Sequence, residues 1–434
     1  MKRRPTAAPE PTDTLPVARN PHFRRLWAAQ VLSQIAQNLL NFALIIRVYQ
    51  LAQHTRVANI SVALLILSFG VPSILFAPAA GVYVDHWNKK FVLVTANVLR
   101  AVLVLGYLLV QHDLVLVLVL SFIISSITQF FAPAEAAAIP SLVTPDQLLR
   151  ANSLFVFTLY GSFIVGYSAS APVIALFGVN GPYYLTGLMF ALAGLLVAYL
   201  PNIPAVSAMA PLKHVVRYTA REINHNWRLI RDNHNLSFPI TQLTITQAGL
   251  GVLLALAPAL SVAVLHVPIQ DASQYLVIPA GVGMVLGVAA IGRLVARYSK
   301  TRVIAVGLAA AGLALLLLGL TSRLHSLATS RALIMSTLAG LVVAILVLIL
   351  GFMNALVSVA SQTILQENTT EATRGKVFGA LGMMVNIAAT LPILFAATLA
   401  DLTSVNTVIG ALGAMLLTFA AAQYWHLRSI GKLL

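Results

Sequence analysis

The chain has 434 residues, of which 59% are hydrophobic and only 9% are charged, with 27 Lys and Arg against 12 Asp and Glu. A soluble domain usually carries about a quarter of its residues as charged side chains, so this composition excludes an ordinary water-soluble protein. The absence of cysteine excludes disulfide frameworks, thiolate catalysis and cysteine-ligated metal sites, and the net charge of +15 fits the basic loops of a membrane protein better than a nucleic-acid surface.

Apolar runs of about 20 residues, the length that crosses a bilayer as a helix, follow one another along the chain. The first 20 residues are basic and proline-rich and lack the apolar stretch of a signal peptide, so we interpret residues 1–24 as a cytoplasmic basic tail. Twelve transmembrane helices are predicted, at residues 25–50, 60–84, 91–111, 114–132, 151–177, 182–201, 237–265, 273–296, 303–321, 332–353, 376–400 and 404–425. An even number places both termini on the same side.

The distribution of basic residues orients these spans. With the N-terminus in the cytoplasm, 22 of the 27 Lys and Arg fall on the inner face of a cytoplasmic (inner) membrane, as the positive-inside rule requires. The polar interval 202–236 divides the chain into two six-helix bundles, 25–201 and 237–425, and a short tail follows at 426–434. The basic residues of the interval share one side of a helical wheel, which predicts an amphipathic linker on anionic lipid at the cytoplasmic face.

Four amide side chains mark one face of the first span. They lie within about 60° of one another on a helical wheel, and they are Gln30, Gln34, Gln37 and Asn41. Because an unsatisfied polar group in hydrocarbon costs several kcal/mol, this face points either toward a water-filled substrate cavity or toward a neighbouring helix.

Arg100 lies near the middle of the third span. A central arginine costs roughly 2.5–3.5 kcal/mol on insertion scales and normally faces the interior of a bundle. Three roles stay open for it: attracting an anionic group of a substrate, pairing with a carboxylate, or extending to an interface.

The two halves of the chain echo each other. Residues 81–90 after the second span and residues 292–301 after the eighth both place a small residue before a basic turn. Inside the membrane, one polar stripe recurs at the same spacing in the fourth and tenth spans: Ser121, Ser125, Thr128 and Gln129, then Asn354, Ser358, Ser361 and Gln362. Repeated halves with inward polar stripes are typical of transporters with a site between two bundles, although small polar residues also pack helices together.

Residues 81–90 resemble the signature loop of the major facilitator superfamily, Gly-x-x-x-Asp-Arg-x-Gly-Arg-Lys or Arg. Gly81, Asp85, Lys89 and Lys90 match, with Lys89 in place of the usual Arg, while position 88 is Asn instead of Gly and position 86 is His instead of Arg. Asn is frequent at this position in the drug:proton antiporter branch that contains macrolide-efflux proteins and the enterobactin exporter, so the loop resembles that branch.

Two further segments, 133–153 and 366–378, resemble the same branch, so that the resemblance covers nearly the whole chain. The antiporter signature of the fifth span is degraded: Gly161, Gly166 and Pro172 remain, but the paired glycines after Pro172 are missing. The resemblance implies an all-α membrane protein with twelve helices in two pseudo-symmetric bundles, working by alternating access.

The resemblance also implies a cytoplasmic gate. Its residues are Gly81, Asp85, Lys89, Lys90, Arg374 and Gly375. The Asp85 carboxylate would face the N-terminus of the eleventh helix near Gly375, where free N–H groups and a partial positive charge would hold it. The alternatives are a solvated loop charge at Asp85 and topology-setting charges at Lys89 and Lys90.

Carboxylates are almost absent from the spans. Glu135, at the end of the fourth span, and Asp85 are therefore the candidates for proton coupling. The shortage of internal acid argues against a mainly cationic substrate, and it favours a neutral or anionic amphiphile held by Arg100, by the amides of the first span and by the two polar stripes.

The pattern as a whole predicts a secondary active exporter, driven by an ion gradient, with protons as the coupling ion by resemblance. We expect a monomer that binds a small organic compound, with no cofactor, no metal, no nucleic-acid partner and no enzymatic activity. No phosphate-binding loop for ATP is present in the sequence. An uptake permease and a non-transporting receptor or assembly factor of the same fold are the alternatives.

Overall fold

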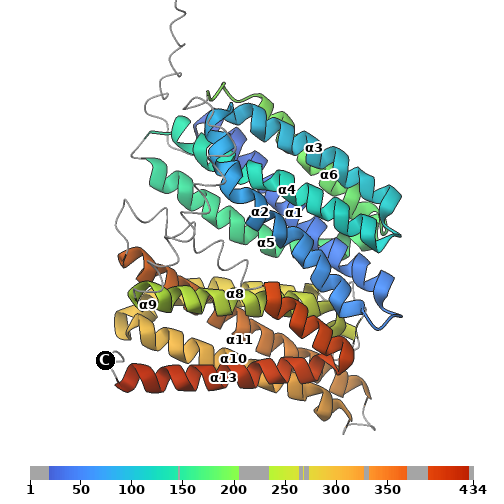
Figure 1. The fold of residues 1–434 in the computed structure, drawn as a ribbon, viewed down its shortest axis with the longest axis vertical. Coiled ribbons are helices and arrows are strands. Elements are labelled where there is room, and N and C mark those ends of the chain that lie inside the picture. Colours follow the sequence, from blue (N-terminus) through green and yellow to red (C-terminus); the bar gives the residue numbers. More distant parts are fainter. Residues whose placement is uncertain are drawn as a thin grey trace, which may run out of the picture. The chain divides into compact units, whose positions relative to one another are not determined.

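The computed structural model describes residues 19–144, 147–204, 234–262, 267, 273–326, 332–368 and 390–429, and every regular element in these ranges is a helix (Figure 1). The long helices are α1 (Pro21–Ala52), α2 (Ala58–His86), α3 (Lys89–Val110), α4 (Leu114–Ala138), α5 (Leu148–Phe177), α6 (Gly181–Ala198), α8 (His234–Leu260), α9 (Ile278–Arg297), α10 (Lys300–Ser326), α11 (Ala332–Glu367) and α13 (Val405–Ser429). A shorter apolar helix, Thr390–Leu402, precedes α13.

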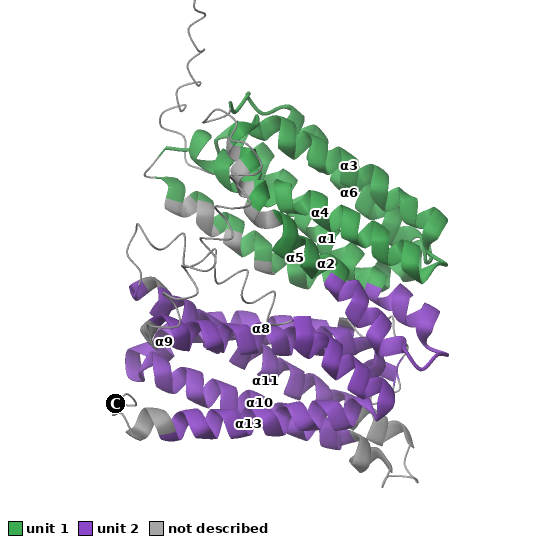
Figure 2. Ribbon diagram, viewed as in Figure 1, with its two compact units in different colours: residues 1–44, 68–221 green, residues 45–67, 222–434 purple. Residues whose placement is uncertain are grey.

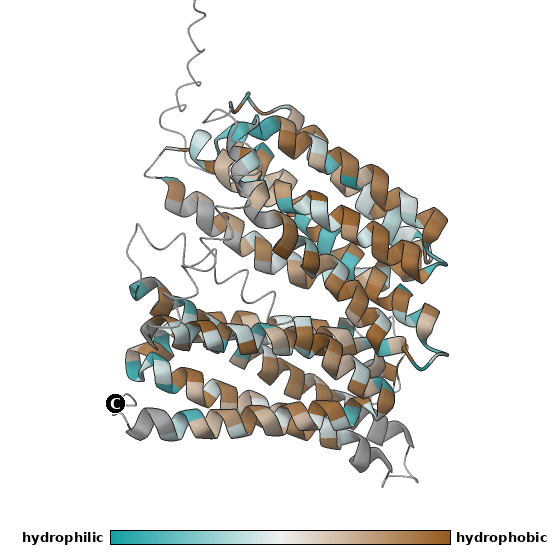
Figure 3. Ribbon diagram, viewed as in Figure 1, coloured by the Kyte–Doolittle hydropathy of each residue, from teal (hydrophilic) through white to brown (hydrophobic). Residues whose placement is uncertain are grey.

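Eleven of the described helices are long and apolar enough to cross a membrane, and apolar residues dominate their lengths (Figure 3). They match eleven of the twelve predicted spans. The remaining span, predicted at 376–400, contains most of the helix Thr390–Leu402, and its residues before 390 lie outside the described part of the chain. The chain is thus an all-α, multi-pass membrane protein, as its apolar runs predict.

The predicted start of the tenth span, residue 332, is also the start of α11, but its predicted end at residue 353 is wrong. The helix α11 runs on to Glu367, and its most apolar membrane-length segment is Gly340–Leu365. The polar stripe predicted for the tenth span follows residue 353 and belongs to the same helix. Asn354, Ser358 and Ser361 lie within the continuous helix, where its own backbone hydrogen bonds keep the main chain satisfied in lipid.

The chain forms two compact units (Figure 2). The first comprises residues 1–44 and 68–221, and the second comprises residues 45–67 and 222–434. The end of α1, the turn after it and the start of α2 are therefore grouped with the second unit.

In the first unit, α3 packs along both α4 and α6. Side-chain caps set where two of these helices begin: the Asn88 side chain accepts a hydrogen bond from the N–H of Phe91 at the start of α3, and Asp113 accepts one from Leu116 at the start of α4. Such caps satisfy N–H groups that have no partner inside the helix. They fix the start of α3 and α4, the two helices that carry Arg100 and Glu135.

In the second unit, α9 packs along α11 and α10 packs along α13. The α9–α11 contact is close enough that a Cβ atom added to Gly283 would collide with the carbonyl oxygen of Leu348. Small residues let membrane helices approach this closely, which replaces the hydrophobic driving force that lipid does not supply.

The start of α2 is capped by a residue from far along the chain. One Asp401 carboxylate oxygen accepts hydrogen bonds from the backbone N–H (3.0 Å) and side-chain amide (2.7 Å) of Asn59, and the other accepts one from the N–H of Ile60 (2.9 Å). All three residues belong to the second unit. A carboxylate is favoured at this position because free N–H groups and the positive end of the helix dipole meet there.

Candidate substrate and proton-coupling site

Arg100 lies in the interior of the first unit, with only 2% of its surface exposed. Its guanidinium carbon lies 4.4 Å from the ring centroid of Phe131 on α4 and 4.5 Å from that of Phe190 on α6. Each contact is within the range in which an aromatic face attracts a cation. The two rings thus stabilise the cation where water is excluded.

Hydrogen bonds fix the orientation of this guanidinium. Its Nη2 donates to Oδ1 of Asn97 (2.8 Å), and its Nε donates to the Ala96 carbonyl oxygen (3.3 Å). The same Asn97 oxygen accepts a hydrogen bond from the Ser33 hydroxyl on α1 (2.9 Å). Asn97 therefore links Arg100 on α3 to the helix that carries the four amides.

Glu135 on α4 is the carboxylate that interacts electrostatically with Arg100. It is 7% exposed, and its Oε1 is buried without a hydrogen-bond partner among the described residues. The Nδ2 of Asn97 is also buried and unpartnered. Buried polar atoms are normally paired, so an acceptor and a donor are left over around one buried cation. We interpret the Glu135 oxygen as a position that can take up a proton and the Asn97 amide as a donor to a water molecule.

The amides of α1 make contacts mainly within the first unit. Gln30 is buried and its Nε2 donates to the Phe155 carbonyl oxygen on α5 (3.3 Å), and Gln37 donates to Oδ1 of Asn41 (2.9 Å). Asn41 in turn is hydrogen-bonded to the Tyr167 side chain of α5. Gln34 is half-buried. The stripe thus serves helix–helix hydrogen bonding at Gln30 and Asn41, one of the two roles that the sequence left open.

The contact of α1 with α5 also explains a glycine of the fifth-span signature. A Cβ added to Gly166 would lie 2.6 Å from Cβ of Asn38 and 2.8 Å from the Ile35 carbonyl oxygen. Gly161, by contrast, has open space around its Cα. Gly166 is therefore a packing position in which any side chain would push α1 away.

The polar residues of α4 turn toward different neighbours. Ser121 is buried, donates to the Val117 carbonyl oxygen and is hydrogen-bonded to the Tyr107 hydroxyl on α3 (2.8 Å). Ser125 donates to the carbonyl oxygen of Phe69 on α2 (2.7 Å). Thr128 is half-buried and bonds back to its own helix. Of these three, Thr128 keeps the most accessible side chain.

The equivalent stripe on α11 lies in the second unit. Asn354 and Ser358 are half-buried, whereas Ser361 is fully buried with its hydroxyl oxygen unpartnered among the described residues. The stripe therefore presents two accessible polar side chains one turn apart, with a third directed into the helix packing.

The predicted gate residues are described in part. Lys89 is 1% exposed. Its backbone N–H donates to the Ile203 carbonyl oxygen (3.0 Å), and its Nζ donates to the Pro204 carbonyl oxygen (3.5 Å). Lys90 is half-buried. Arg374, Gly375 and the side-chain positions of Gly81 and Asp85 lie outside the described part of the structure. Asn88, where the signature loop usually has Gly, is the cap of α3.

The family assignment rests on a comparison with known proteins. A family model described as the Major Facilitator Superfamily matches residues 26–347, more than half of the 434-residue chain. The chain belongs to the major facilitator superfamily. This membership makes it a transporter-family protein and confirms the resemblance carried by residues 81–90.

Curated relatives within the superfamily match over part of their length. Macrolide efflux protein A of Streptococcus pyogenes is 28% identical over 180 residues, which cover 41% of this chain and 44% of that protein. The uncharacterized MFS-type transporter YkuC of Bacillus subtilis is 28% identical over 189 residues, 42% of each chain. The matches therefore span less than half the length of these relatives.

Solved structures of transporters share the superfamily fold. The nucleoside transporter NupG aligns with a TM-score of 0.71 at 14% identity, covering 93% of this chain and 98% of that one. The human organic anion transporter MFSD10 aligns with a TM-score of 0.58 at 15% identity, covering 92% and 99%. At these identities the likeness establishes the major facilitator fold alone.

Sequence reasoning missed four residues of the Arg100 cluster: Ser33, Asn97, Phe131 and Phe190. One signal was available, because Asn97 lies three residues before Arg100 on the same helix face. Phe131 and Phe190 carry no such signal, since they lie on α4 and α6 and not on the helix of Arg100. Among the described residues, no three His, Asp or Glu side chains lie close enough to hold a metal ion.

Proposed function

We propose that the protein is a proton-driven exporter of a small amphiphilic or anionic organic compound. It works by alternating access of the bundles 25–201 and 237–425, in a cytoplasmic membrane with both termini in the cytoplasm. The observation that supports proton coupling is the Glu135 carboxylate, buried beside Arg100 with one oxygen unpartnered. An intramembrane carboxylate of this kind is typical of proton relays.

Coupling follows from the charge balance of this pair. When Glu135 is ionised, it balances the Arg100 cation, and the buried cluster is neutral. When Glu135 takes up a proton, the cluster carries one net positive charge, which is costly in a dry interior. That charge favours release of the proton to the side that the cluster faces. Antiport follows if the substrate binds the deprotonated cluster, so that proton and substrate occupy it alternately.

The substrate class follows from the same chemistry. Gln34, Asn354 and Ser358 are accessible polar groups that suit a neutral or anionic amphiphile. The other polar residues that we propose for substrate binding are Gln30, Gln37, Asn41, Ser121, Ser125, Thr128 and Ser361. The relative named as a macrolide efflux protein supports export of a drug-like compound. Arg100 would act on an anionic group electrostatically, since its own donors are engaged with Asn97 and Ala96.

The decisive experiment uses proteoliposomes with an imposed pH gradient and a mixed set of drugs and metallophores. Wild-type protein is expected to accumulate a substrate when the interior is acidic, because protons leave as substrate enters. Glu135→Gln removes the proton acceptor and keeps the shape. It is expected to lose gradient-driven accumulation to the level of empty liposomes while retaining exchange of labelled for unlabelled substrate.

Asp113→Asn is the matched control, because it also turns a carboxylate into an amide, at an exposed cap where Asn serves equally well. Unchanged coupling in Glu135→Gln would remove this residue from the mechanism. Accumulation only with an acidic exterior would identify an uptake permease. Specific ligand or partner binding without flux would identify a receptor or assembly factor.

A second prediction concerns the cytoplasmic gate, for which we propose Asp85 with Gly81, Lys89, Lys90, Arg374 and Gly375. Asp85→Asn keeps the size of the side chain and removes the charge that a helix N-terminus favours. Transport is expected to fall to background while insertion stays normal, as measured by flux in proteoliposomes and protein yield in membranes. Full transport with normal insertion would show that Asp85 is a solvated loop charge.

A further inference from the structure

The outer face of α9 combines an apolar stripe with a basic end. Gly283 and Gly287 of this helix are buried against α11, and an exposed stripe lies on its other side. The stripe falls within about 80° on a helical wheel, and its members are Val282, Leu286, Ala289, Arg293 and Arg297. An apolar stripe of this kind suits contact with acyl chains, and it ends at two arginines.

The spacing sets the depth of these arginines. At 1.5 Å per residue, Arg293 lies about 10 Å and Arg297 about 16 Å beyond Leu286 along the helix axis. Arg297 is also the last residue of the apolar span. Arg297 therefore lies at the end of the span and Arg293 about 6 Å inside it along the axis, from where a long side chain can extend to the lipid headgroups.

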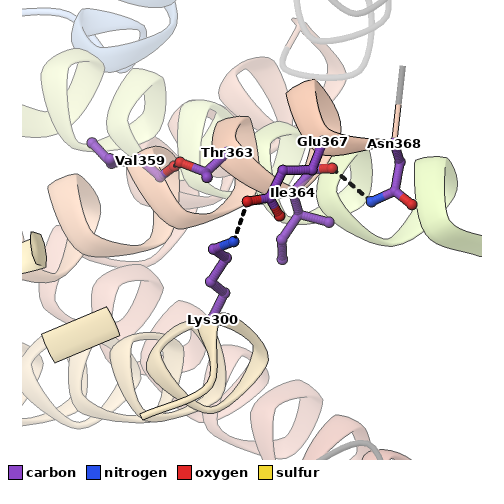
Figure 4. A network of polar contacts seen from close by, with 6 residues as sticks. All are labelled: Lys300, Val359, Thr363, Ile364, Glu367 and Asn368. Carbon is purple, nitrogen blue, oxygen red and sulfur yellow. Dashed lines mark hydrogen bonds and ion pairs between the residues drawn. The ribbon is translucent and has the colours of Figure 1, made fainter. Parts of the chain in front are cut away.

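The neighbouring side chains leave these charges available. Neither Arg293 nor Arg297 forms an ion pair with a described residue. The nearby Lys300, at the start of α10, is paired with Glu367 at the end of α11 (Figure 4), so this carboxylate is already engaged. Arg302, also exposed, lies over the half-exposed ring of Tyr298 at 5.4 Å. The end of α9, the turn after it and the start of α10 thus carry three exposed arginines and an exposed tyrosine between residues 293 and 302.

The equivalent position of the first half is different. There Lys89 is buried, with its Nζ directed to a backbone carbonyl oxygen. In the match of residues 81–90 with residues 292–301, Lys89 corresponds to Lys300, while Val82 and His86 correspond to Arg293 and Arg297, so the arginine pair of α9 has no counterpart in the first half.

We propose that Arg293, Arg297 and Arg302 bind the phosphate of an anionic phospholipid whose acyl chains lie along the apolar stripe of α9. Guanidinium groups donate paired hydrogen bonds to phosphate oxygens, and basic surfaces beside membrane helices bind anionic headgroups. The inference goes beyond the proposed function and does not depend on transport. It also differs from the predicted contact of the 202–236 linker with lipid.

The test uses the purified full-length protein in a neutral detergent. It is titrated with dioctanoyl phosphatidylglycerol, with dioctanoyl phosphatidylcholine or with inorganic phosphate, and bound lipid is counted by native mass spectrometry alongside thermal stability. Wild type is expected to retain phosphatidylglycerol over phosphatidylcholine and to lose this preference in high salt. Arg293→Gln/Arg297→Gln is expected to bind phosphatidylglycerol about tenfold to thirtyfold more weakly, and Arg293→Lys/Arg297→Lys is expected to keep most of the preference.

The double variant Arg19→Gln/Arg56→Gln is the control, since it removes the same charge from two exposed positions elsewhere. A loss of phosphatidylglycerol binding in this control equal to that of the α9 variant would show only a net-charge effect and would overturn the site. Equal retention of both lipids by wild type would overturn it as well. Stabilisation by inorganic phosphate at the same concentration would mean a simple anion site and not a lipid site.

Discussion

Replacing Arg100 with methionine is expected to cost about 3–5 kcal/mol of stability and to abolish transport. Methionine fills much of the volume between Phe131 and Phe190 but leaves the buried Glu135 carboxylate without its counter-charge. It also removes the donor to Asn97. Thermal unfolding in detergent measures the first effect, and flux in proteoliposomes measures the second.

A double-mutant cycle separates the charge pair from packing. Arg100→Met/Glu135→Gln removes both charges, and it is expected to recover most of the lost stability while transport stays absent. Arg100→Lys keeps the charge but loses the planar group that stacks between two rings, and an intermediate stability is expected. If the single methionine variant were as stable as wild type, Arg100 and Glu135 would not be a coupled pair.

Gly283→Ala is the second change with a large expected effect, at the contact of α9 with α11. The added methyl group meets the Leu348 carbonyl oxygen, which is rigid backbone, so the two helices must separate along their length. Overpacking of this kind typically costs about 1–3 kcal/mol, and more is expected here because main chain cannot rotate away. Thermal unfolding and the yield of folded protein in membranes measure the loss.

The same helix supplies the matched control. Gly292 is exposed and has open space where a Cβ would lie, so Gly292→Ala is expected to be neutral or to stabilise by about 0.5–1 kcal/mol through helix propensity. Equal stability of both alanine variants would contradict the close α9–α11 contact.

Hydropathy predicts most of this fold because lipid imposes a simple rule. A stretch that crosses the bilayer must satisfy its backbone internally, so apolar runs locate the helices without any knowledge of their neighbours. At α11 the apolar run ends before the helix does: Asn354 and Ser358 are half-buried, and a helix that packs on protein tolerates polar residues which an isolated apolar run does not.

The candidate site was predictable only as far as one helix at a time. A helical wheel places Gln30 and Asn41 on one face, but it does not say that Gln30 reaches a carbonyl oxygen of α5. For Arg100 the sequence left both the bundle interior and an interface open, because its stacking depends on Phe131 and Phe190, which are 31 and 90 residues away in sequence. Helix packing brings these residues together, and packing has no local signal.

The cap on α2 has a consequence for the biosynthesis of the protein. Asp401 follows Asn59 by 342 residues, and ribosomes add about 5–20 residues per second, so roughly 20–70 s separate the emergence of the two partners. Throughout that interval the first N–H groups of α2 must be satisfied by water, lipid headgroups or the insertion machinery. A nascent chain released before residue 401 would lack the carboxylate that accepts hydrogen bonds from the first N–H groups of α2.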